Sequence, residues 1–288
     1  MCSDRERVPL SQDALRRALL APAGPYQALE VLATVGSTNT ALLTAARRGA
    51  PDRTVLVAEH QSAGRGRAAR SWVAPARSGL TLSVLLRPTE VPRARWGWLP
   101  LLVGVALSRT VSTVGELPAA LKWPNDLLLG PHQRKAGGIL AEALPASDTP
   151  TGTAPAVVVG IGLDVTLRAE ELPVPGATSL ALERSACTDR DLLLSALLRT
   201  LDTELRQWCE HAGDPVASGL REAYQQRCVT LGEQVRVELP RGGELTGTAG
   251  EIDTEGRLVV LSGGQRHALS AGEVTHVRRG PALPAAVW

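Results

Sequence analysis

The stretch ALKWPNDLLLGPHQRKAGGILAEA, residues 120–143, decides how this chain folds. Its apolar segments ALKW, DLLLG and KAGGILAEA predict three short strands, the last two joined by the turn GPHQR. The segment VVVGIGLDV, residues 157–165, predicts a further buried strand. Upstream, strands are predicted at 29–34, 54–59 and 80–86. Strands in this number predict a sheet at the centre of the fold.

Helices are predicted between and after these strands. They cover residues 11–20, a segment capped by Ser37 or Thr38 and ended by Gly49, residues 93–114 with a break at Pro100, residues 188–211 capped by Thr188, and a last helix to about Gln226. After Cys228, short alternating strands separated by RGG, TEG and SGG turns predict a small β-barrel. The predicted class is α+β. Its parts are an N-terminal extension (1–28), a main domain (29–227) containing a loop at 145–155, a barrel (228–280) and a tail (281–288).

Composition excludes several classes of protein. Apolar residues make up 44% of the 288 residues, enough for a buried core. The 31 basic and 29 acidic residues nearly cancel, which argues against a general polyanion binder. The four scattered cysteines argue against a disulfide scaffold. No apolar run approaches the roughly 18–20 residues of a membrane span, and the N-terminus has no secretion signal. We therefore expect a cytoplasmic protein.

The chain contains very few lysines and asparagines. Arginine outnumbers lysine 29 to 2, and asparagine occurs twice. Lys122, Lys135 and Asn125 lie within 14 residues of each other, and Asn39 is the fourth such residue. Residues that persist against so strong a bias are candidates for positions where no other residue serves.

A basic loop, HQSAGRGRAARSWVAPAR, covers residues 60–77. From His60 to Thr89 the chain has five arginines and no acidic residue. The glycines of GRGR let the backbone approach a ligand closely, and guanidinium groups suit phosphate or carboxylate. Alone, the loop could equally be a solvated basic segment or one that contacts RNA.

Three further motifs carry polar or glycine residues at strand ends. In KWPND (122–126), an amide beside a carboxylate suits a magnesium–nucleotide site, although a simple Asx turn would also explain it. In RKAGGIL (134–140), a lysine precedes two glycines, which suggests a ligand lying on bare backbone. In GIGLD (160–164), the glycines fit either ligand approach or close strand packing.

Taken together, GSTN, EHQSAGRGR, SW, KWPND, RK-x-GG-I-L-x-E and GIGL-D resemble the biotin protein ligase family over residues 29–278. The resemblance implies a mixed sheet backed by helices, as in class II synthetases, followed by an SH3-like barrel. It also implies a two-step reaction. Biotin and Mg-ATP give biotinyl-5′-AMP, and the biotinyl group then passes to a lysine of a biotin carboxyl carrier domain of acetyl-CoA or acyl-CoA carboxylase.

The resemblance also implies roles for individual residues. The expected biotin-binding residues are Ser37, Thr38, Asn39, Gln61, Gly64, Arg65, Gly66, Arg67, Lys135, Gly137 and Gly138. The expected nucleotide-binding residues are Arg70, Trp72, Lys122, Asn125, Asp126, Gly160, Gly162 and Asp164, with Asp126 also on the metal. The expected catalytic residues are Arg65, Arg67, Lys135 and Lys122. These cations would offset the repulsion between a carboxylate and the ATP α-phosphate.

Two departures from the family pattern stand out. Asp164 takes the place of the usual asparagine of GIGxN, which removes a donor and adds a charge. Only about 36 residues precede GSTN, too few for the DNA-binding domain of many relatives, so we expect a ligase, monomeric or weakly dimeric, without specific DNA or membrane binding. The alternatives are a lipoate or octanoate ligase of related fold, and an RNA-binding protein. GRGR and KWPND disfavour the first, and the scarcity of aromatic residues disfavours the second.

Overall fold

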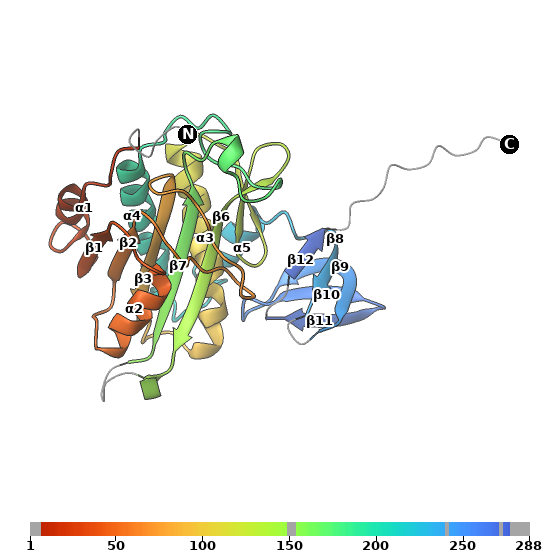
Figure 1. The fold of residues 1–288 in the computed structure, drawn as a ribbon. Helices are drawn as coiled ribbons and strands as arrows, with labels where there is room; N and C mark the ends of the chain where they lie inside the picture. The colour runs from red at the N-terminus through yellow and green to blue at the C-terminus, as the bar shows by residue number, and fades with distance from the viewer. Residues whose placement is uncertain (1–6, 149–153, 240–241, 271–272, 277–288) are drawn as a thin grey trace.

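A seven-stranded sheet forms the body of the protein (Figure 1). The structure is a computed structural model and describes residues 7–148, 154–239, 242–270 and 273–276. The strands are β1 (Ala28–Leu32), β2 (Thr54–Ala58), β3 (Gly79–Leu86), β4 (Ala119–Lys122), β5 (Asp126–Leu129), β6 (Arg134–Leu144) and β7 (Ala156–Asp164). Their order is β1-β2-β3-β7-β6-β5-β4. β1 and β2 are parallel, and the other neighbours are antiparallel, so the sheet is mixed, as expected.

Helices cover both faces of this sheet. They are α1 (Gln12–Leu19), α2 (Thr38–Arg47), α3 (Leu99–Val114), α4 (Arg190–Glu210) and α5 (Leu220–Gln225), with 3₁₀ helices η2 (Arg93–Trp98), η3 (Ala146–Asp148) and η4 (Ala169–Glu171). Alternate residues of a strand face opposite sides, so Leu85 and Val158 pack against α2, whereas Val84 and Val159 belong to the core beneath α3 and α4. Helix α2 therefore stands alone on one face (Figure 1).

Two details of the predicted helices are corrected by the structure. Ser37 caps α2, but α4 is capped by Asp189, whose side chain accepts from the Leu192 N–H, and not by Thr188. The expected helix 93–114 is a 3₁₀ helix followed by α3. Pro100 lies in the first turn of α3, where its missing N–H costs nothing, and it is not an internal kink.

The segment Arg93–Val114 is long and apolar enough to cross a membrane by length and composition alone. The expectation that no run approaches that length was wrong for this segment. In the structure 67% of the most apolar stretch of this segment is buried, and it packs against the sheet and α4. The core helix of a folded domain meets the same criteria of length and composition. The expected loop at 145–155 is described only in part, and the tail at 281–288 lies outside the described residues.

A second, five-stranded antiparallel sheet follows α5, as the turn pattern predicted. Its order is β11-β10-β9-β8-β12. The strands are β8 (Gln234–Glu238), β9 (Glu244–Ile252), β10 (Leu258–Ser262), β11 (Gln265–Leu269) and β12 (Glu273–His276). The β9–β10 turn contacts the main domain, where Trp98 Nε1 donates to Thr254 O at 3.0 Å and Trp123 Nε1 donates to Gly256 O at 3.4 Å. The barrel therefore packs directly on the KWPND segment.

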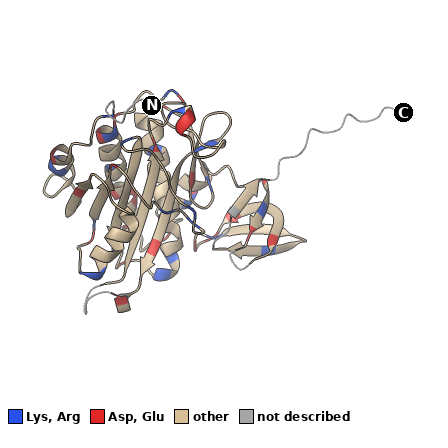
Figure 2. Ribbon diagram, in the orientation of Figure 1, with Lys and Arg blue, Asp and Glu red and all other residues tan. Residues whose placement is uncertain are grey.

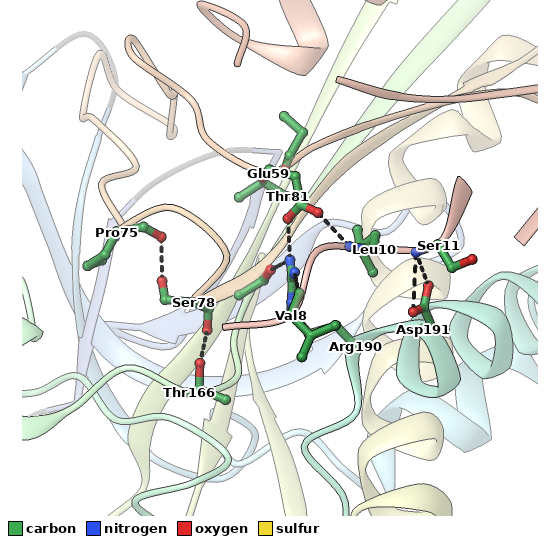
Figure 3. A network of polar contacts seen from close by, with 12 residues as sticks. Val8, Leu10, Ser11, Glu59, Pro75, Ser78, Thr81, Thr166, Arg190 and Asp191 are labelled. Atoms are coloured by element: carbon green, nitrogen blue, oxygen red, sulfur yellow. Dashed lines mark hydrogen bonds and ion pairs between the residues drawn. The ribbon is translucent and has the colours of Figure 1, made fainter. Parts of the chain in front are cut away.

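A buried ion pair joins the N-terminal segment to the sheet (Figure 3). Arg190 Nη1 lies 2.6 Å from Glu59 Oε2, and both side chains are less than 8% exposed. Glu59 also accepts from the Leu10 N–H, and Arg190 also donates to Val8 O and Gly79 O. This network fixes the end of β2 relative to the start of β3.

We expect Arg190→Met to lower the free energy of unfolding by about 3–5 kcal/mol, because it leaves the Glu59 carboxylate buried without its cation. Replacing both residues, as Glu59→Leu with Arg190→Met, should recover much of the loss. The matched control is Arg266→Met, which breaks the exposed pair with Glu251 and should cost about 1 kcal/mol or less. Urea unfolding measures all three. Equal losses for the buried and the exposed pair would contradict the prediction.

Candidate active site

A cavity of about 270 Å³ lies on the α2 face of the sheet. Its floor is the backbone of β6 and β7, where Gly138 is paired with Gly162 and Leu140 with Gly160. Because side chains on one face recur every second residue, Gly160 and Gly162 remove two neighbouring side chains from the same face. The glycines of GIGLD thus leave a bare strip of sheet.

The first turn of α2 closes one end of this strip. The Ser83 hydroxyl is hydrogen-bonded to Asn39 Oδ1 at 2.6 Å and to Thr38 Oγ1 at 2.8 Å. Asn39 Nδ2 donates to Leu140 O at 3.1 Å and to Glu142 Oε2 at 2.9 Å. These bonds hold Asn39 in place, so that a Cβ added at Gly160 would lie 2.3 Å from its Oδ1.

Gln61 lies next to this cluster at the end of β2. Its Oε1 accepts from the Thr38 N–H at 2.8 Å and is 3.0 Å from Thr38 Oγ1. Because the carbonyl end of the amide is fixed by Thr38, the NH₂ end is directed away from it, and Gln61 lines the cavity. The first turn of α2 and the segment after β2 thus both bring side-chain amides to one end of the cavity.

The indole of Trp72 lies on the other part of the strip. A Cβ added at Gly162 would be 2.5 Å from Trp72 Cε2, and one added at Gly138 would be 3.2 Å from Trp72 Cζ3. Trp72 Nε1 is buried and has no hydrogen-bond partner among the described residues. The ring therefore forms an apolar wall that packs on bare backbone, with a donor still to be satisfied.

The GRGR loop carries its cations to the rim of the cavity. Arg65 forms a double contact with Glu142, with Nη2 2.9 Å from Oε1 and Nη1 3.1 Å from Oε2. Arg67 Nη1 donates to Asn125 Oδ1 at 3.2 Å, which joins this loop to KWPND. Arg70 also lines the cavity.

Lys135 and Asp126 form an ion pair at the far end, with Nζ 2.5 Å from Oδ1. Asp164 is the only acidic residue among the described residues that line the cavity, and it is 5% exposed. Burial raises the pKa of Asp164 to about 7, although the positive charge of Lys135 opposes this shift. Four basic side chains, Arg65, Arg67, Arg70 and Lys135, thus line the same cavity as one buried carboxyl group.

The structure brings most of the expected site residues together. Those that line the cavity are Ser37, Thr38, Asn39, Gln61, Arg65, Gly66, Arg67, Arg70, Trp72, Asn125, Lys135, Gly138, Gly160, Gly162 and Asp164. Gly64, Lys122, Asp126 and Gly137 are not among the lining residues. Gly137 faces α3, since a Cβ there would lie 3.4 Å from Leu107 Cδ2. Lys122 lies near His276 of the barrel, whose pKa is lowered by burial and by the charge of Lys122.

Two residues that hold the site together were missing from the sequence-based set. Ser83 is fully buried in β3 and anchors Asn39, and a lone hydroxyl in an apolar strand was the available signal. Glu142 binds both Asn39 and Arg65, and as an acidic residue at the end of RKAGGILAE it could have been paired with the basic loop. Pro173 and Val174 also line the cavity, and no motif marked them.

Charge elsewhere on the protein is mixed. Basic and acidic residues are interspersed along both the main domain and the barrel (Figure 2). The concentration of cations around the cavity is therefore a local feature. Within the described residues no group of three or more His, Cys, Asp and Glu side chains could hold a metal ion.

Comparisons with known proteins agree with this geometry. The family described as the biotin/lipoate A/B protein ligase family matches residues 31–164, and the biotin protein ligase C terminal domain matches residues 230–277. The first match defines a class of protein ligases, and the second places the barrel with the SH3-like domains of that class.

The relatives narrow the class further. A biotin–[acetyl-CoA-carboxylase] ligase of Mycobacterium tuberculosis is 43% identical over 96% of this chain and 98% of its own length. The bifunctional ligase/repressor BirA of Escherichia coli is 31% identical over 85% of this chain and 73% of its own length. A biotin protein ligase from Aquifex aeolicus, solved with biotin and ATP, superposes with a TM-score of 0.69 at 27% identity, covering 88% of this chain and 100% of that one. The chain belongs to the biotin protein ligase family.

We expect Gly160→Ala to lower the free energy of unfolding by about 1–3 kcal/mol, because the new methyl group would overlap Asn39, which is bonded at both ends. Gly176→Ala is the matched control, since a Cβ there meets nothing within 4 Å and the residue adjoins the same cavity. It should change stability by about 1 kcal/mol or less. Urea unfolding compares the two. If both variants were equally stable, Asn39 would not be fixed in the way described.

Proposed function

We propose that this protein activates biotin with ATP to biotinyl-5′-AMP and transfers the biotinyl group to one lysine of a biotin carboxyl carrier domain. The observation that carries the proposal is the convergence of four basic side chains on a bare glycine floor closed by polar groups of α2. A ligand with an anionic end, an apolar middle and a polar head fits such a cavity. The relative from Mycobacterium tuberculosis bears the name of the same activity.

The first half-reaction joins two anions. The biotin carboxylate oxygen attacks the α-phosphorus of ATP, the bond to the β-phosphate oxygen breaks, and pyrophosphate leaves. Lys135, Arg65 and Arg67 would offset the repulsion between the reactants and hold them in position, which is the main need of such a step. To contact the ligand, Arg65 must give up its ion pair with Glu142. Before substrate binds, that ion pair would hold the GRGR loop in position.

The second half-reaction needs no nucleophile from this chain. The amine of the acceptor lysine attacks the carbonyl of the mixed anhydride, the bond to the phosphate oxygen breaks, and AMP leaves while the amine loses a proton. The GRGR loop would exclude water until that amine arrives. Trp72, which lies over Gly138 and Gly162, would contact the apolar chain of biotin, and Asn39 and Gln61 its polar head.

Magnesium would arrive with the nucleotide. Asp126 and Asn125 offer oxygen atoms, but Asp126 Oδ1 already contacts Lys135 and Asn125 Oδ1 already accepts from Arg67. A single carboxylate with an amide fits Mg²⁺ that brings its own phosphate and water ligands. When bound, the ion would neutralise charge on the phosphates of ATP.

The partner we propose is the carrier domain of acetyl-CoA or acyl-CoA carboxylase. We propose no specific DNA or membrane partner, a cytoplasmic location, and a monomer or weak dimer. We also propose that residues 29–227 hold both substrates and that residues 228–280 form a supporting barrel. The contacts of Trp98 and Trp123 with the β9–β10 turn support a role for the barrel in positioning KWPND.

Pyrophosphate release tests the function. Purified protein with Mg-ATP should release pyrophosphate when biotin is added and not when lipoate or octanoate is added. Addition of a carrier domain should then increase the mass of the carrier by one biotinyl group, and a carrier with its acceptor lysine replaced should remain unmodified. Release that depends on lipoate would instead favour the related lipoate ligase activity.

We expect Lys135→Ala to slow biotin-dependent pyrophosphate exchange by about 10²–10³-fold, the usual effect of removing one group that stabilises developing charge. Lys135→Arg should also be slow, because the planar guanidinium group of arginine does not replace the compact ammonium group that fits against Asp126. Arg16→Ala, which removes an exposed cation from α1, is the control and should keep normal exchange. Near-normal exchange in both Lys135 variants would remove Lys135 from the proposed site.

A further inference from the structure

Asp164 is the third member of a row on the cavity face of β7. Gly160, Gly162 and Asp164 follow one another at every second residue, so all three point to the same side of the sheet. Asn39 lies over the first position and Trp72 over the second. The carboxyl group therefore stands at the end of the bare strip, and it lines the cavity while only 5% of the residue is exposed.

The groups packed around Asp164 do not neutralise it. From β6 the nearest charge is Lys135, whose Nζ is bound to Asp126. From β3 the paired residue is Gly79, and the Arg190 that reaches its carbonyl is paired with Glu59. From the 173–177 segment come the apolar residues Pro173, Val174 and Ala177.

The GRGR loop adds Arg67 and Arg70 to the same cavity. No hydrogen bond or ion pair to the Asp164 carboxyl group is present among the described residues. A carboxylate buried in this way without a partner is strongly disfavoured relative to its neutral form. Burial accordingly raises the pKa of Asp164 to about 7.

The ligands of the proposed function disfavour an ionised Asp164 further. Biotin and ATP both carry negative charge into the cavity, and an ionised Asp164 would repel them. A neutral carboxyl group does not repel them, and its O–H is a hydrogen-bond donor that a carboxylate lacks. Of the two protonation states, the neutral one thus suits an occupied cavity.

We propose that Asp164 contacts the bound adenylate as a neutral carboxylic acid, donating a hydrogen bond to it, so that ligand binding takes up one proton. The proposal rests on the proposed function, because the adenylate supplies both the charge and the acceptor atom. Well below pH 7 most of the free protein already holds the proton, and binding is at its strongest. Above pH 7 the proton must be taken from water, so affinity falls as pH rises.

Calorimetric titration with biotinol-5′-AMP, which lacks the reactive carbonyl, tests the proposal without metal or turnover. Titrations between pH 6 and 8.5, in buffers of different ionisation enthalpy, count the protons taken up. We expect no more than a small uptake at pH 6, an uptake approaching one proton above pH 7.5, and an affinity that falls about 5–10-fold per pH unit above pH 7.

Asp164→Asn supplies the decisive variant, because the amide keeps the shape and a permanent donor. It should bind with little pH dependence and without proton uptake. Asp13→Asn, on the exposed surface of α1, is the matched control and should behave as the unmodified protein does.

Other outcomes would overturn the proposal in distinguishable ways. The unmodified protein could bind tightly without taking up a proton, or its affinity could rise with pH, as expected if Asp164 acted as an ionised carboxylate. Either result would refute the role of Asp164 and leave the ligase function intact. Uptake that persists in Asp164→Asn would assign the proton to another group. Failure of the unmodified protein to bind biotinol-5′-AMP at any pH would refute both the ligase function and this inference.

Discussion

The contact between Asn39 and the bare backbone of Gly160 is the constraint on which the cavity depends. It lets the first turn of α2 approach the sheet closely, and Ser83, Leu140 O and Glu142 then hold the Asn39 amide in one orientation. Glu142 is shared with Arg65, so the position of the basic loop follows from that of α2. A side chain at residue 160 would separate these parts, which is why a small backbone feature governs a site built from four distant segments.

Much of this arrangement could be predicted from local patterns. The strands around KWPND and GIGLD, a cap at Ser37 or Thr38 and the change to a small barrel after Cys228 all follow from apolar spacing and turn residues. What could not be predicted is which side of a strand each residue faces. Gly137 and Gly138 are adjacent and so face opposite sides of the sheet, but only the packing of the helices decides that Gly138 faces the cavity and Gly137 faces α3. Ser83 and Glu142 were missed for the same reason, since their importance comes from neighbours that only the sheet order supplies.

The barrel is tied to the main domain at the KWPND segment. Trp123 donates through its indole to the β9–β10 turn and through its backbone N–H to Thr230 Oγ1 at 3.0 Å. Gly97 allows the same turn to approach, since a Cβ there would lie 2.3 Å from Glu255 O. Asn125 and Asp126 follow directly after this fixed tryptophan. The orientation of KWPND is thus set jointly by the two sheets, although the barrel contributes no residue to the cavity lining among the described parts of the chain.

The two lysines of the chain both lie around this region, Lys135 bound to Asp126 at the cavity and Lys122 beside His276. Every other basic side chain of fixed charge is an arginine, which reacts poorly with acylating reagents. Apart from the N-terminal amine, an amine-directed label therefore has no remote lysine to modify. Attaching the protein to a surface through Lys135 would obstruct the cavity, whereas an adenylate that escaped from the cavity would find few places on its own enzyme to acylate.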